Sequence, residues 1–121
     1  MTDERREYVR VREKLVTFVK QSATGKVHRA LTRDLGGVGI CLVTNEPLAS
    51  GAPLELELKL PGYDRMIPFT GMVAWSKVME GPPKPYAEPM REIGIKFVEI
   101  APKDLALIKQ YAAMNAVPPA G

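Results

Sequence analysis

The stretch LELELKL at residues 54–60 alternates strictly between leucine and a charged side chain. Successive side chains of a β-strand point to opposite faces of a sheet, so a period of two is typical of a half-buried strand. Glu55 and Glu57 then lie on the outer face, where charges keep an exposed surface soluble, and we do not expect a catalytic carboxylate pair. This clearest strand signal of the chain predicts a protein built mainly of β-structure.

Five further stretches predict strands on either side of it. They cover residues 14–20, 27–34, 40–43, 66–75 and 92–98, which are rich in β-branched and aromatic residues or alternate in polarity. In the last two, Trp75 and Phe97 fall on the inward register, so we expect both in the core. Pro68 predicts an edge or a bulge, and Gly71 a bend. Six closely spaced strands with bends favour a small antiparallel barrel, because closure removes exposed strand edges.

The connections and the C-terminal segment complete this expectation. Gly25 marks a hairpin turn, and the cluster Gly36, Gly37 and Gly39 predicts a backbone that turns, bulges or approaches a neighbour closely. The proline-rich residues 77–91 predict a long, mobile loop. Pro102 sits at a first helical position, and apolar residues follow at helical spacing. We therefore expect an arm at residues 1–13, a six-stranded antiparallel β-barrel with a C-terminal α-helix at residues 14–116, and a tail at residues 117–121.

Length and composition restrict the class of protein. The chain of 121 residues is 45% apolar and 26% charged, as expected for one folded soluble domain. Cys41 and His28 are the single residues of their types, so one chain can form neither a disulfide framework nor a Cys/His zinc site. With no signal-peptide or membrane-spanning pattern, we expect a cytoplasmic protein that does not insert into membranes. A net charge of +3 permits an anionic partner but does not indicate a nucleic acid polymer.

Enzyme constellations are not supported by the sequence. Cys41 lies inside the apolar run ICLV, so a buried structural cysteine and an exposed strand His28 are expected rather than a catalytic dyad. The glycine-rich DLGGVGICL has neither the Lys and Ser/Thr of a phosphate loop nor the spacing of a dinucleotide-binding turn. We therefore expect a protein that is not an enzyme and has no catalytic residues.

Two charged motifs remain. The arm ERREYVR carries Arg5, Arg6 and Arg10 ahead of the first strand, and Asp34 opens the glycine-rich turn one hairpin later. An arm that leads into the first strand can fold back toward the end of the second. Arginine binds phosphates and the O6 and N7 of guanine bidentately, and an aspartate accepts from the guanine amino group. This combination suits an anion that contains guanine.

With these motifs the sequence resembles the PilZ domain family of bacterial cyclic di-GMP receptors, whose pattern is RxxxR followed by DxSxxG. Arg6 and Arg10 fill the first motif, while Asp34 and Gly39 fill the ends of D-L-G-G-V-G. TGMVAWSK at residues 70–77 and GIKFVEI at residues 94–100 look like later strands of the family, so the resemblance covers nearly the whole chain.

The resemblance implies a PilZ-type barrel and a receptor mechanism without a cofactor. Arg6 and Arg10 would hold guanine edges and phosphates, Asp34 would read a guanine, and Arg5 would assist. Gly36 and Gly39 would let the backbone approach the ligand. Ordering of the arm would then expose a surface for an unidentified effector protein.

One position departs from the family pattern, since Gly36 replaces the motif serine. Losing a neutral hydrogen bond costs about 0.5–1.5 kcal/mol, a roughly twofold to tenfold loss of affinity. Binding is therefore expected to be weakened and retained. The alternative is a degenerate PilZ domain that no longer binds the nucleotide and acts as a protein-interaction adaptor.

Overall fold

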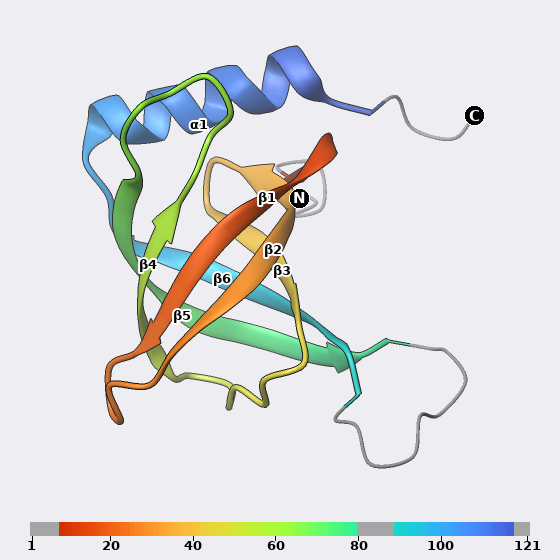
Figure 1. The fold of residues 1–121 in the computed structure, drawn as a ribbon, viewed down its shortest axis with the longest axis vertical. Coiled ribbons are helices and arrows are strands. Elements are labelled where there is room, and N and C mark those ends of the chain that lie inside the picture. The colour runs from red at the N-terminus through yellow and green to blue at the C-terminus, as the bar shows by residue number, and fades with distance from the viewer. Residues whose placement is uncertain (1–7, 80–88, 118–121) are drawn as a thin grey trace, which may run out of the picture.

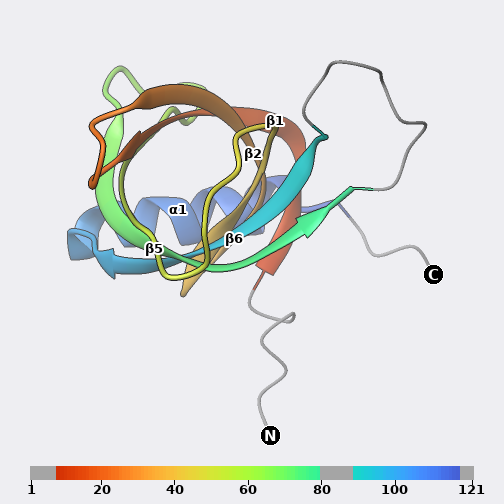
Figure 2. The ribbon, with the colours of Figure 1, turned by 90° about the horizontal axis from the view of Figure 1, so that it is seen from below.

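The computed structural model describes residues 8–79 and 89–117. In this part of the chain, six strands precede one helix: β1 Tyr8–Gln21, β2 Val27–Gly36, β3 Gly39–Thr44, β4 Pro53–Leu58, β5 Ile67–Val78, β6 Arg91–Glu99 and α1 Pro102–Asn115. All neighbouring strands are antiparallel, and the barrel closes in the order β1-β2-β3-β6-β5-β4 (Figures 1 and 2). The expected six-stranded antiparallel barrel with a C-terminal helix is confirmed.

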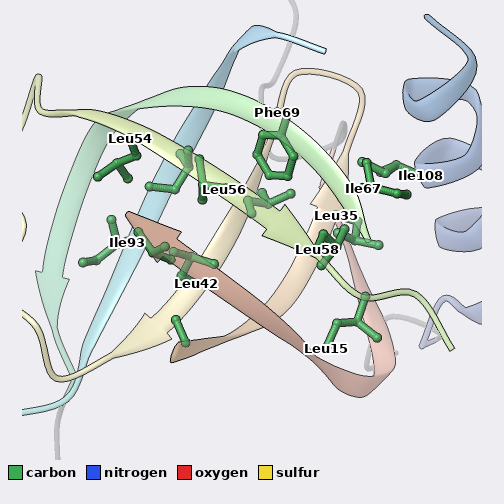
Figure 3. Packing of buried hydrophobic residues seen from close by; sticks show 14 of the residues in the cluster. Leu15, Leu35, Leu42, Leu54, Leu56, Leu58, Ile67, Phe69, Ile93 and Ile108 are labelled. Atoms are coloured by element: carbon green, nitrogen blue, oxygen red, sulfur yellow. The ribbon is translucent and has the colours of Figure 1, made fainter. Parts of the chain in front are cut away.

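The core fills the inside of this barrel. Its buried apolar side chains come from all six strands and from α1, and each fully buried leucine or isoleucine contributes about 1.5–3 kcal/mol. The leucines of residues 54–60 are all buried, as their alternation predicts. Figure 3 shows Ile108 of α1 directed at Ile67, where the helix covers one end of the barrel.

Contacts at both ends of the helix fix its position. Near the N-terminal end, the carboxylate of Asp104 is buried and accepts a hydrogen bond from the guanidinium of Arg65, which lies in the segment before β5. After the C-terminal end, the backbone N–H of Val117 donates to the carbonyl of Arg10 at 2.8 Å, and Ala116 pairs with Val11 of β1. The helix is thus joined to β1 as well as to the core.

The first strand is longer than the sequence predicts. We expected an arm up to residue 13, whereas β1 begins at Tyr8, so residues 8–13 belong to a strand. Tyr8 and Arg10 pair with Gly36 and Asp34, and the ladder then skips to Leu15. The charged sequence conceals this pairing, because the irregularity breaks the alternation that marks a regular strand. Arg10 is therefore held by a ladder.

Trp75 lies on the opposite face from the one predicted. The ladder between β5 and β6 shifts between Val73 and Trp75, and such a bulge turns the following side chains to the other face. Val73 is buried, but Trp75 is 44% exposed. Phe97 is partly buried and packs edge to face on Phe69 with ring centroids 5.1 Å apart, so its inward placement is confirmed.

The predicted turn and bend are also present. Gly25 has φ 75°, a left-handed conformation that glycine adopts without strain, and it closes the hairpin between β1 and β2. A second irregularity of β5 falls between Thr70 and Gly71. Pro68 lies where β5 pairs with β4 and before its pairing with β6 begins, so its missing N–H is tolerated.

Three expectations concern residues outside the described ones: the first seven residues of the arm, positions 80–88 of the proline-rich connection and the tail from residue 118. In the described part of the chain, no helix has the length and apolar content needed to cross a membrane.

Candidate ligand-binding site

An arginine and an aspartate face each other on the outside of the barrel. Arg10 of β1 and Asp34 of β2 are direct cross-strand partners, and Nε of Arg10 donates to Oδ1 of Asp34 at 3.2 Å. The Arg10 side chain is 55% exposed and that of Asp34 only 15%. Among the contacts of the described residues, Arg10 uses only Nε, so both terminal nitrogens can donate to a ligand.

Arg33 supports this pair from the side. It is the extra residue of a bulge between β2 and β3, which brings its side chain beside that of Asp34. Its Nε donates to Oδ2 of Asp34 at 3.3 Å, and its Nη1 lies 2.9 Å from Oε1 of Glu92 in β6. Burial opposes the charge on Arg33, but the hydrogen bond to Glu92 and the Asp34 carboxylate outweigh it and raise the pKa. Asp34 is thereby fixed from two sides.

The sequence alone does not indicate that Arg33 and Glu92 support this pair. The pattern TRD shows that Arg33 precedes Asp34, but in a regular strand consecutive side chains point to opposite faces. Only the bulge brings the side chains of Arg33 and Asp34 together on one face of the sheet. Glu92 reaches Arg33 through β3–β6 pairing, for which no local sequence signal exists.

The glycines of the turn lie next to this cluster. Gly36 pairs with Tyr8, two residues from Arg10 along β1. At Gly39, a Cβ would overlap the carbonyl oxygen of Ile95, so the predicted close approach is confirmed with β6 as the neighbour. None of Gly36, Gly37 and Gly39 has a positive φ. Gly39 is therefore needed for strand packing, while Gly36 lies beside the arginine-bearing strand.

A single row of paired residues crosses five strands of the barrel. It runs from Arg10 through Asp34, Cys41 and Gly94 to Trp75. A Cβ at Gly94 would overlap the indole of Trp75, so the ring lies directly over this glycine. The row places an exposed aromatic ring at one end and an arginine–carboxylate pair at the other. The two ends are four strand spacings apart along the curved sheet, so the row holds groups suited to an anion and to an aromatic base at separate places.

Cys41 and His28 do not form a dyad. The thiol of Cys41 is buried, and burial, reinforced by the Asp34 carboxylate, raises its pKa to about 11, which makes it a poor nucleophile. His28 is partly buried rather than exposed as predicted, because its ring nitrogens are covered, and burial lowers its pKa. Asp34 is the cross-strand partner of Cys41, and His28 lies six residues before Asp34, about 20 Å along β2, so His28 is far from the thiol.

Two of the predicted arginines cannot be placed. Arg5 and Arg6 lie outside the described residues. Of the other predicted site residues, the structure brings Arg10, Asp34 and Gly36 together, and Gly39 lies at the far side of the same turn. A surface hollow of about 700 Å³ is lined by other residues, among them Phe18, Glu57 and Pro68. Over the described ranges, no group of three or more His, Cys, Asp or Glu side chains is arranged to hold a metal ion.

Comparisons with known proteins agree with the fold. The inhibitor of motility from Bacillus subtilis (MotI/DgrA) has a TM-score of 0.70 and 24% identity, covering 94% of this chain and 51% of that one. The PilZ domain of YcgR from Escherichia coli, solved with c-di-GMP, has a TM-score of 0.70 and 12% identity, covering 89% and 87%. MrkH of K. pneumonia in its apo state has a TM-score of 0.76 and 18% identity, covering 95% and 52%.

The chain thus spans about half the length of MotI and MrkH. At these identities the likeness to solved structures shows the fold. A search of curated proteins found no match. The sequence itself matches the family described as "PilZ domain" over residues 4–113. With the barrel, the helix and this match over nearly its whole length, the chain belongs to the PilZ domain family.

Proposed function

We propose that this PilZ domain binds cyclic di-GMP on the face around Arg10 and Asp34 and transmits the bound state to a partner protein. The observation that carries the proposal is the cross-strand Arg10–Asp34 pair, in which a fixed carboxylate orients a half-exposed guanidinium. Two solved structural neighbours, the PilZ domain of YcgR and a MrkH complex, contain c-di-GMP.

The chemistry of the pair matches the ligand. The terminal nitrogens of Arg10 donate to a guanine edge or to a phosphate oxygen. Both oxygens of Asp34 already accept one hydrogen bond, and each has a second lone pair for the amino group of guanine. Because Arg33 and Arg10 hold the carboxylate, little side-chain entropy is lost on binding. The exposed ring of Trp75 offers a stacking surface for a base.

The arm enters the proposal through its motif. Arg6 precedes Arg10 by four residues, and Arg5 is adjacent. In the proposed mechanism these arginines close over the ligand and Gly36 lets it approach the turn. Ordering of the arm then changes the surface that a partner recognises, with no chemical step. Since cyclic di-GMP is an intracellular messenger, the proposed place of action is the cytoplasm.

Calorimetric titration with cyclic di-GMP, with GTP as the control ligand, tests this function. Arg10→Ala should weaken binding by about tenfold to a hundredfold, because it removes hydrogen bonds from a charged donor. Arg29→Ala is the matched control, since Arg29 is an exposed arginine of β2 that pairs with Phe18. Equal affinities of the two variants would remove Arg10 from the site.

A second variant tests the turn. Gly36→Ser restores the hydroxyl of the family motif, and we expect affinity to rise by about twofold to tenfold. The serine can donate to the ligand only if the ligand lies at this turn. Unchanged or weaker binding would mean that the ligand does not occupy the turn as proposed.

Gly36 is also the observation that favours the alternative function, an adaptor that binds protein and not nucleotide. An adaptor would show no saturable heat with cyclic di-GMP even at high micromolar concentration. Its partner contacts would then be unchanged by the nucleotide.

A further inference from the structure

The helix that closes the barrel brings a lysine to the edge of the proposed site. Lys109 of α1 lies over Gly37, and its Cε and Nζ are 3.0 and 3.7 Å from the position that a Cβ of this glycine would occupy. Lys109 is exposed. Within the described ranges no carboxylate lies within ion-pair distance of its ammonium group. This ammonium is therefore available to an external anion.

Gly37 belongs to the turn that follows Asp34 and Gly36. The turn presents no side chain at Gly36 or Gly37, so the lysine fills space that another residue would occupy. A ligand that approaches the backbone here meets the end of Lys109. The turn contributes a backbone without side chains at Gly36 and Gly37, and the helix contributes a cation beside it.

The helix also holds the other side of the site. Val117, just after α1, donates to the carbonyl of Arg10 at 2.8 Å, and Ala116 bridges Val11. Figure 1 shows the start of β1 beside the C-terminal half of α1. One helix therefore contacts both the turn after Asp34 and the strand that carries Arg10, which keeps Lys109 in a defined place relative to both.

We propose that Lys109 is a ligand-binding residue, and that its ammonium group pairs with a phosphate of the cyclic dinucleotide. This inference rests on the proposed function and adds a contact that neither arginine nor glycine motif contains. Cyclic di-GMP carries one negative charge on each of two phosphodiesters. The flexible ammonium group of a lysine acts as a point charge and can follow a phosphate oxygen. The planar guanidinium of Arg10 is instead suited to two parallel hydrogen bonds with a guanine edge or a phosphate.

The test compares two lysines of the same helix. Lys109→Ala should weaken cyclic di-GMP binding by about fivefold to tenfold, less than a buried charge-assisted bond contributes, because water and salt screen an exposed ammonium group. Lys109→Arg should restore most of the affinity, because it keeps a cation at the same place. Lys103→Ala is the matched control, since it removes the same charge from an exposed position six residues earlier, on another face of the helix.

The salt dependence of binding separates a direct contact from a structural effect. Removing a cation that pairs with phosphate should reduce the slope of log Kd against log salt, whereas a disturbed fold would leave that slope unchanged. Lys109→Ala and Lys103→Ala with equal affinities would overturn the proposal, since both would then act only through net charge. An unchanged salt slope in Lys109→Ala would also overturn it.

The two proposals fail in different ways. If the wild-type protein binds, Arg10→Ala binds more weakly as expected and Lys109→Ala behaves like Lys103→Ala, the receptor function stands and only the role of Lys109 is wrong. If wild-type protein does not bind cyclic di-GMP at all, both are wrong.

Discussion

Trp75 is the single tryptophan of the chain and lies at the far end of the row that begins at Arg10. Stacking of a base on an aromatic ring contributes about 1–3 kcal/mol, so Trp75→Ala should weaken binding of cyclic di-GMP by about fivefold to a hundredfold. Trp75→Phe keeps a ring over Gly94 and should lose much less. Titration followed by tryptophan fluorescence checks the wild type, and calorimetry checks both variants. A Trp75→Ala protein with wild-type affinity would show that the ligand does not reach this ring.

The thiol of Cys41 gives the fold a dependence on alkaline pH. Burial, aided by the Asp34 carboxylate, raises its pKa from 9.0 to about 11. Between these values the unfolded chain releases a proton that the folded chain keeps, so stability is lost as the pH rises through this range. The loss amounts to about 2–3 kcal/mol.

Denaturant unfolding at about pH 8 and about pH 11 measures this loss. Cys41→Ala lacks the titrating group and should lose less stability between the two pH values than the wild type. Equal losses would mean that the thiol titrates alike in the folded and unfolded chain.

At the scale of elements, the approach of β3 to β6 depends on Gly39. Gly39→Ala would drive a Cβ into the backbone carbonyl of Ile95, and a paired strand cannot move away without losing its ladder. We expect a loss of about 1–3 kcal/mol in the free energy of unfolding. Gly37→Ala is the control, because its Cβ meets only the flexible end of Lys109 and should change stability by about 0.5 kcal/mol or less. Thermal and denaturant unfolding measure the stability of Gly39→Ala and Gly37→Ala. Equal stabilities of the two variants would contradict the steric argument.

Regular elements could be predicted from the sequence and irregular ones could not. Alternation over residues 54–60 located β4, which ends at Leu58, and its inward leucines, and the proline and apolar spacing located α1. The bulges at Arg33 and before Trp75 reverse the face of a side chain, which a strict period of two cannot show.

The candidate site was predictable to the same extent. The charged arm, the glycine-rich turn and the family motif point to Arg10 and Asp34, and the structure makes these two residues direct cross-strand partners. The contacts of Arg33 with Glu92 and of Lys109 with Gly37 join residues that are far apart in the sequence. Such contacts are determined by how strands and helix pack, and no local pattern encodes them.

On the scale of the whole molecule, the two ends of the described chain are joined where Val117 donates to Arg10. Val117→Pro removes this N–H, and the extended backbone of Ala116 (φ −66°, ψ 137°) is one that a residue before proline adopts. We expect a loss of about 0.5–1.5 kcal/mol in stability and weaker binding of cyclic di-GMP, because Arg10 is less firmly held. Val117→Ala retains the N–H and serves as the control.

Denaturant unfolding measures the stability of Val117→Pro and Val117→Ala, and calorimetry measures their affinity for cyclic di-GMP. Matching stabilities and affinities for the proline and alanine proteins would show that this hydrogen bond does not hold the arginine-bearing strand in place. A change in stability alone would confine its role to the fold.

The closed strand order determines how a partner can recognise this domain. Every one of the six strands has a neighbour on both sides, with β1 next to both β2 and β4. Within the described residues this closure is partial, because β4 pairs with β1 only at residues 17–21 and with β5 only at residues 67–72, so the far ends of these two long strands have no strand partner on that side. A partner that added a strand would have to pair with these ends, whereas the closed part of the barrel presents only the side chains of its outer face.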